Sequence, residues 1–220
     1  MTERSAWQSA LAHEARAAPE LASFAVATGP LLLTSPRGDG HTVIVLPGFG
    51  GDDVTTTPLR WFLGRLGYRA IGWGLGRNMG FDRRVAAGLD ELLTETSSAA
   101  RPASLVGWSL GGVQALDAAR RRSARVRAIV TLGSPLIGRF PPAGVPTTSI
   151  HSRTDAIVPW RASLLTEASL HENVEVNGSH LGLGHNPAVA LIVADRLAQR
   201  PGAWQPFRPP NWARRFLPAA

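Results

Sequence analysis

The sequence predicts an α/β fold with a doubly wound, mostly parallel sheet. Short runs of apolar and β-branched residues alternate along the chain with longer segments of helical periodicity. The short runs are continuously apolar, which is typical of parallel strands that are covered on both faces. A length of 220 residues fits one domain with a complete core.

The first 35 residues are expected to form an N-terminal helical extension. Apolar residues recur near helical spacing over residues 5–28, and Pro19 starts a second helix there or kinks the first. We expect this extension to cover a sheet edge, and a lid or a membrane-touching helix is the alternative.

No segment of the sequence predicts a membrane span or a signal peptide. The apolar stretch 21–33 is interrupted by polar residues and by Pro30, and it falls short of the ~18 consecutive apolar residues of a span. It also lies behind Glu14 and Glu20, too far from the start for a signal peptide. We expect a soluble, cytoplasmic protein, and transient contact with a lipid surface stays open.

The core is expected over residues 36–200 and a C-terminal tail over residues 201–220. The predicted strands cover residues 41–46, 68–73, 103–108, 126–132, 147–151 and 173–176. The predicted helices cover residues 57–66, 82–97, 110–122, 161–169 and 187–199. About ten residues separate Leu136 from Thr147, so there is no room for a cap domain between those strands. The tail is rich in Pro, Trp and Arg, and it packs on the core or frays.

Composition excludes several classes of chemistry. The chain has no cysteine, which rules out disulfides, thiolate catalysis and cysteine-based zinc sites. All 23 basic residues are arginine, and the net charge is +7. Such a charge can serve nucleic-acid binding. The densest cluster, residues 120–127, ends a predicted helix and has no interleaved aromatic residues, so we expect no nucleic-acid partner.

Residues 105–112 carry the most informative motif of the chain. The apolar Leu105-Val106 leads into Gly107-Trp108-Ser109-Leu110-Gly111, and helix-forming residues follow. This Gly-x-Ser-x-Gly layout predicts a sharp strand-to-helix turn that exposes the serine above a sheet. A side chain at either glycine would crowd the turn. Ser109 is therefore the candidate nucleophile.

A serine hydroxyl needs a base and a carboxylate that orients the base. Asp155 follows the predicted strand 147–151, and His180 follows the strand 173–176. All three residues therefore lie at the carboxyl edge of the sheet, where ligands bind in such folds. The alternative for Asp155 is a cap or a turn, and His185 is the rival of His180. We expect no metal site, because the two histidines lack a convincing third ligand.

Acyl transfer also needs N–H donors for the developing oxyanion. One candidate is the backbone N–H of Leu110, at the start of a helix. The other is the N–H of Phe49, in the glycine-rich segment 47–52 after the first strand. Four further residues are expected to line the substrate pocket: Trp108, Arg77, Asn78 and Leu136. A plain surface loop is the alternative for Arg77 and Asn78.

The chain resembles the α/β-hydrolase superfamily, and more narrowly its bacterial lipase/esterase branch, over roughly residues 40–200. The segments that carry the resemblance are 46–50, 107–112, 131–135, 152–155 and 178–182. The resemblance implies Ser109 as nucleophile, His180 as general base and acid, and Asp155 as the orienting carboxylate. It implies no cofactor. Pro47-Gly48 replaces the His-Gly of many relatives.

These observations predict a serine esterase or lipase that forms an acyl-enzyme on a small-molecule or lipid ester. A thioesterase, acyltransferase, lactonase or perhydrolase would use the same three residues. A non-catalytic binding module on the same fold is the third alternative.

Overall fold

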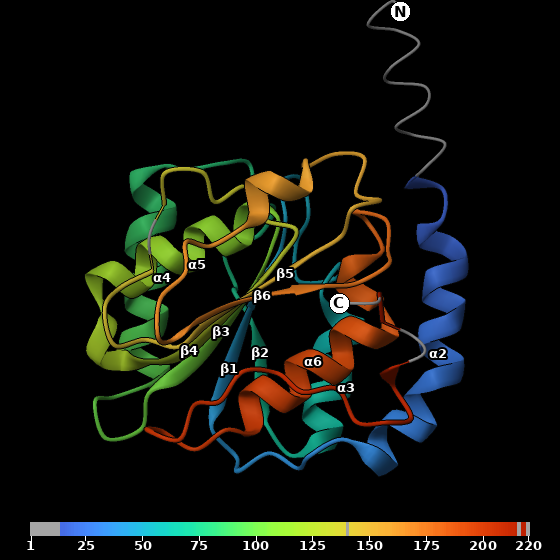
Figure 1. The fold of residues 1–220 in the computed structure, drawn as a ribbon. Coiled ribbons are helices and arrows are strands. Elements are labelled where there is room, and N and C mark those ends of the chain that lie inside the picture. The colour runs from blue at the N-terminus through green and yellow to red at the C-terminus, as the bar shows by residue number, and fades with distance from the viewer. Residues whose placement is uncertain (1–13, 140, 215–216, 219–220) are drawn as a thin grey trace, which may run out of the picture.

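The computed structural model describes residues 14–139, 141–214 and 217–218. Its centre is a six-stranded sheet in the order β2-β1-β3-β4-β5-β6, and every neighbouring pair is parallel (Figure 1). The strands are β1 (Thr42–Leu46), β2 (Arg69–Gly72), β3 (Ala103–Trp108), β4 (Val126–Leu132), β5 (Thr147–His151) and β6 (His171–Glu175). This confirms the expected fold class.

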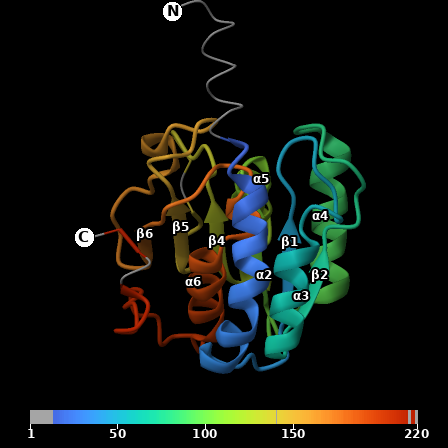
Figure 2. The same ribbon diagram turned by 90° about the vertical axis from the view of Figure 1, so that its right-hand side faces the viewer.

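Helices cover both faces of the sheet (Figure 1). The helices are α2 (Ala17–Thr34), α3 (Thr57–Leu66), α4 (Arg83–Thr96), α5 (Leu110–Arg121) and α6 (Pro187–Ala198). Helices α4 and α5 cover one face. Figure 2 shows α2 between α3 and α6 on the other face.

The alternation of side chains along β1 explains why both faces need a cover. Val43 and Val45 pack with residues of α2, α3 and α6, whereas Ile44 and Leu46 pack with residues of α4 and α5. All four are at most 1% exposed. Successive side chains of a strand point to opposite faces, so a continuously apolar strand builds two cores.

The predicted helix 161–169 is wrong. Only a short 3-10 turn, η2 (Trp160–Ser163), forms there, and Leu164 returns to extended backbone. The side chain of Asn173 explains the extended path. Its Oδ1 accepts from the N–H of Leu165 at 2.8 Å, and its Nδ2 donates to the carbonyl of the same residue at 2.9 Å.

Helix α2 differs from the predicted helix 5–28. It begins at Ala17 and continues to Thr34 through Pro30, whereas residues 5–13 lie outside the described part of the chain. A proline inside a helix removes one hydrogen bond. Packing outweighs this loss, because Phe24 and Leu31 are buried in the core. The rings of Phe24 and Phe62 also pack edge to face, with their centroids 6.1 Å apart.

Among the described residues, α2 is also the helix that is long and apolar enough to cross a membrane. Its 18 residues have a mean hydropathy of 1.2, and 17% of them are buried. Core helices of soluble proteins and N-terminal signal sequences meet the same criterion. Here the inner face packs on the domain, while Val26 and Leu33 on the outer face are 81% and 85% exposed. The polar residues within the stretch 21–33 do not predict an apolar helix as long as α2.

Candidate active site

Ser109 lies at a strained turn between β3 and α5. Its φ of 53° is positive, a value that no other non-glycine residue of the described chain adopts. The turn is tight because both glycines of the motif touch backbone. A Cβ on Gly107 would lie 2.4 Å from the backbone of Gly112, and a Cβ on Gly111 would lie 2.5 Å from the carbonyl oxygen of Leu46. Such strain is maintained mostly at functional sites.

Asp155 and His180 form a buried pair. The Oδ2 of Asp155 lies 2.6 Å from the Nδ1 of His180, and the two side chains are 2% and 5% exposed. The other oxygen of Asp155 accepts from the N–H groups of Ile157 and Val158, at 2.9 and 2.7 Å. The carboxylate of Asp155 therefore bonds both to its own turn and to the imidazole of His180.

Gly133 lies where this pair approaches the turn at Ser109. A Cβ on Gly133 would lie 3.0 Å from Asp155 Oδ2 and 3.2 Å from His180 Nδ1. The preceding residue, Leu132, accepts the N–H of Ser109 at 2.8 Å. Trp108 adds a further link, since its indole N–H donates to the carbonyl of His180 at 3.0 Å. The ends of β3, β4, β5 and β6 thus bring the three predicted residues together.

Within the described chain the Oγ of Ser109 makes no hydrogen bond. The serine–histidine hydrogen bond of such sites is often long until substrate binds.

The segment Pro47–Gly51, called here the 47–51 loop, lies against Ser109. A Cβ on Gly48 would be 3.2 Å from Ser109 Cβ and 3.9 Å from its Oγ, so any larger residue would crowd the serine. Neither the N–H of Phe49 nor that of Leu110 donates to an acceptor in the described chain. The N–H of Leu110 stands in the first turn of α5, where helices leave N–H groups unsatisfied. Both groups are free to bind an oxyanion.

Solved structures share this arrangement of elements. A metagenomic carboxyl esterase aligns with a TM-score of 0.58 at 15% identity, over 73% of this chain and 75% of its own. Alpha/beta hydrolase domain-containing protein 10 from mouse aligns with a TM-score of 0.55 at 18% identity, over 73% and 89%. A predicted CIB-like hydrolase from Thermoplasma acidophilum gives 0.55 at 17%, over 72% and 86%. The chain has the α/β-hydrolase fold.

The sequence itself matches no protein-family model and no curated protein. At 15–18% identity, the structural likeness establishes the fold alone.

Asn78 does not lie where a pocket residue was expected. Its side chain is fully buried. It donates from Nδ2 to the carbonyl of Pro47 and to Oε1 of Gln114, both at 2.8 Å, and its Oδ1 accepts from Nε2 of Gln114 at 3.0 Å. Its backbone also exchanges two hydrogen bonds with Gly50 and Gly51, each 2.7 Å long. Asn78 therefore fixes the 47–51 loop.

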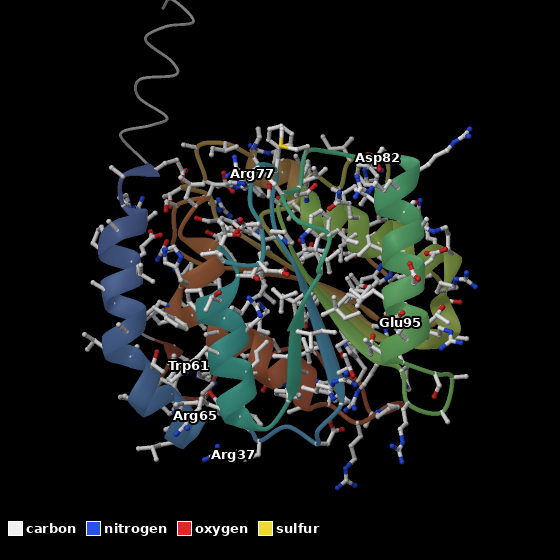
Figure 3. All side chains as sticks on the ribbon, turned by 180° about the vertical axis from the view of Figure 1, so that it is seen from behind. Arg37, Trp61, Arg65, Arg77, Asp82 and Glu95 are labelled. Carbon is white, nitrogen blue, oxygen red and sulfur yellow. The ribbon has the colours of Figure 1, made fainter. Side chains whose placement is uncertain are left out.

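The other pocket candidates divide between surface and core. Trp108 is partly buried beside His180, with ring centroids 6.4 Å apart. Arg77 is exposed at the edge of the domain where α4 begins (Figure 3). Leu136 is 2% exposed and packs into the core with α5. The side chain of His185 contacts the start of α2, where its Nε2 is 2.9 Å from the carbonyl oxygen of Ala17.

A depression of about 660 Å³ lies at the opposite, amino edge of the sheet. Among the residues that line it are Asp39, His41 and Arg69. It is remote from Ser109, because these residues precede or begin β1 and β2, whereas Ser109 follows the end of β3. We assign the chemistry to the carboxyl edge, where the titratable groups converge with the strained turn.

Glu14 and Glu20 also reach this site, which no pattern in the sequence indicates. Glu14 accepts from the backbone N–H groups of Ala156 and His180, and Glu20 accepts from that of Ser179. Each of these bonds joins residues more than 140 positions apart along the chain. No local pattern signals a contact of such separation. The buried amides Asn78 and Gln114 were missed as a pair for the same reason.

Proposed function

We propose that this chain is a serine hydrolase that cleaves carboxylic esters through an acyl-enzyme on Ser109. The observation that carries the proposal is the buried Asp155–His180 pair, 2.6 Å apart, beside a serine at positive φ. A histidine held by a carboxylate next to a strained serine is the arrangement that activates a hydroxyl nucleophile.

The reaction divides into two steps. His180 takes the proton of Ser109 as Oγ attacks the ester carbonyl, and the Asp155 carboxylate stabilises the imidazolium that forms. The oxyanion accepts from the N–H groups of Phe49 and Leu110. Loss of one such donor costs roughly 10²–10³-fold in rate. His180 then gives its proton to the leaving alcohol, and a water activated by the same histidine releases the acid and restores Ser109.

The surface around the site favours esters with an apolar acyl part. Large apolar side chains are exposed on the loops that follow the strands. These residues are Phe49 (66%), Met79 (66%), Phe81 (46%), Ile137 (78%), Ile157 (49%) and Leu181 (42%). Exposed apolar groups gathered on one side mark a surface that binds apolar material. Only residues 133–146 join β4 to β5, which leaves these side chains uncovered by a cap domain. Acyl chains presented at a lipid surface fit this edge.

A series of p-nitrophenyl esters of increasing acyl length, with acyl-CoA thioesters beside them, tests the proposal. We expect ester turnover that rises with acyl length and falls roughly 10⁴-fold or more in Ser109→Ala. Much faster turnover of thioesters would assign the same residues to a thioesterase. Ester turnover that survives Ser109→Ala would refute the mechanism.

A further inference from the structure

The carboxylate of Glu14 links the two loops that carry the Asp–His pair. Its Oε1 accepts from the N–H of His180 at 3.0 Å and from the N–H of Ala156, next to Asp155, at 3.3 Å. Its Oε2 accepts from the N–H of Leu181 at 2.7 Å. Glu14 is 4% exposed. A buried carboxylate needs such donors to offset its lost hydration, and backbone N–H groups next to both residues supply them.

Glu20 binds the residue before the histidine. Its Oε1 accepts from the N–H of Ser179 at 2.9 Å, and its Oε2 accepts from the Ser179 hydroxyl at 2.7 Å. Gly182 leaves the room for this contact, because a Cβ there would lie 1.4 Å from Glu20 Oε2. The segment 177–183, called here the His180 loop, is therefore held by two carboxylates from outside the sheet.

The helix α2 carries Glu20, and Glu14 lies three residues before its start. Figure 2 shows α2 between α3 and α6. Phe24 and Leu31 of α2 are buried in the core that they share with residues of those two helices. At the start of the helix the carbonyl of Ala17 lies 2.9 Å from the Nε2 of His185, two residues after the His180 loop. The position of α2 on the domain thus determines the position of Glu20, and it anchors the chain just after Glu14.

We infer that Glu14 and Glu20 are positioning residues of the active site, and that the N-terminal extension holds His180 and Asp155 in register. This inference rests on the proposed function. His180 and Asp155 lie on separate loops after β6 and β5, and Glu14 Oε1 bonds to both loops at once. Displacement of reacting groups by about 1 Å can cost 100-fold in rate, so this link matters for turnover as well as for folding.

The charge of Glu14 provides a readout that a purely structural role would not change. The charged groups around His180 are Asp155 on its Nδ1, Glu14 at its backbone N–H and Glu20 beyond Ser179, with Arg16 3.7 Å from Glu20. A nearby negative charge favours the imidazolium. Removing the charge at Glu14 therefore takes away one of the negative groups that favour the imidazolium form during turnover.

The test is Glu14→Gln, which keeps the shape of the side chain but replaces one acceptor oxygen by a donor. We expect kcat for a p-nitrophenyl ester to fall roughly 10- to 100-fold with KM changed less than about threefold. The pH profile of kcat/KM should also differ from that of the wild type. Glu95→Gln is the matched control, since Glu95 is exposed at the far end of α4 from Asp82 (Figure 3). We expect it to behave as the wild type.

Amide hydrogen exchange tests the hydrogen bonds of Glu14 and Glu20 to these loops independently of enzyme activity. In Glu14→Gln the amides of Ala156, His180 and Leu181 should exchange faster, and in Glu20→Gln the amide of Ser179. Gly182→Ala is a second variant, because its methyl group occupies the place of Glu20 Oε2 and should expose the same Ser179 amide.

Two results would overturn the inference: wild-type exchange at these amides, or wild-type kcat and pH profile in a folded Glu14→Gln. If instead the wild type hydrolyses no ester, the proposed function fails, while the exchange experiment still decides whether the carboxylates hold the loop.

Discussion

At the scale of single residues, Gly133 shows how the site depends on the absence of a side chain. Its φ of 54° is left-handed, and an added Cβ would meet Leu183 at 2.7 Å as well as Asp155 and His180. Gly138 has a similar φ of 68° with nothing within 4 Å of the added atom. Substitutions at Gly133 and Gly138 should therefore share the cost of backbone strain, whereas only a substitution at Gly133 should disturb the Asp155–His180 pair.

Gly133→Ala should lose activity, whereas Gly138→Ala should lose only stability. The left-handed backbone costs an alanine about 1–2 kcal/mol at either position. At Gly133 the methyl group also displaces the Asp–His pair, so we expect kcat to fall at least tenfold beyond any change in Gly138→Ala. Steady-state kinetics and thermal unfolding of both variants measure this. Equal kinetics would contradict the assigned contact.

Asp155→Asn tests the orienting carboxylate. The amide keeps an acceptor for the N–H groups of Ile157 and Val158, so the turn should persist. Without the charge, the imidazolium loses its partner and the histidine tautomer is no longer fixed. We expect kcat to fall roughly 10³–10⁴-fold with the fold intact by circular dichroism. A loss below tenfold would exclude the assigned role.

His180→Ala should abolish turnover, whereas His185→Ala should keep measurable activity. The side chain of His180 is hydrogen-bonded to the carboxylate of Asp155, whereas that of His185 is hydrogen-bonded to the carbonyl of Ala17. The reverse result would exchange the two assignments.

The three candidate catalytic residues could be proposed from the sequence because the ends of the strands can be predicted from it. Continuous apolar runs mark parallel strands, and Ser109, Asp155 and His180 each follow one of them closely. The roles of Asn78 and Glu14 were not predictable. They depend on side chains that meet only after folding, across separations of 31 and 166 residues in their hydrogen bonds to Pro47 and His180.

At the scale of elements, the 47–51 loop depends on the segment after β2. Asn78 bonds to this loop from one side and to the buried Gln114 of α5 from the other. The loop that offers the Phe49 N–H is thereby tied to the helix that starts at Leu110.

Asn78→Ala should lower kcat while KM stays nearly unchanged. The variant leaves the carbonyl of Pro47 and the Oε1 of Gln114 without a donor, at a cost of about 1–3 kcal/mol for each buried group, while the Nε2 of Gln114 keeps its bond to the carbonyl of Gly80. An oxyanion donor acts only in the transition state, which is why kcat should carry the effect. Asn173→Ala is the control. It also removes two hydrogen bonds to a loop backbone, but these bonds are to Leu165, in the segment between β5 and β6. An equal loss of kcat in both variants would argue against the assignment.

Two elements show where periodicity fails as a predictor. The segment 161–169 has helical spacing, yet the side chain of Asn173 fixes Leu165 in an extended path. Helix α2 continues through Pro30 because the burial of Leu31 outweighs the lost hydrogen bond. In both cases tertiary contacts decide the local structure, and those contacts are not visible in a local pattern.

At the scale of the whole molecule, buried histidines make stability depend on pH. Burial lowers the pKa of His151, against the attraction of Glu175, and its Nδ1 has no hydrogen-bond partner among the described residues. Burial likewise lowers the pKa of His41, although Asp39 opposes the shift. In the unfolded chain both titrate near 6.5. Below that pH the unfolded state binds more protons, so stability is present above it and is lost as pH falls toward the folded pKa values.

The free energy of unfolding should therefore be lower at pH 5.5 than at pH 7.5. Urea denaturation of the wild type at both pH values measures the difference. His151→Gln should reduce it, because this variant removes one of the two titrating groups. A wild-type stability that is flat or rises on acidification would contradict the burial of neutral histidines.

The central claim is that Ser109 is an activated nucleophile at the carboxyl edge of the sheet. Labelling of the intact protein with a fluorophosphonate, followed by peptide mass spectrometry, tests it most directly. We predict one adduct, on Ser109, that forms in the wild type, is absent in Ser109→Ala and slows strongly in His180→Ala. No adduct on the folded wild type, or an adduct that persists in Ser109→Ala, would contradict the claim.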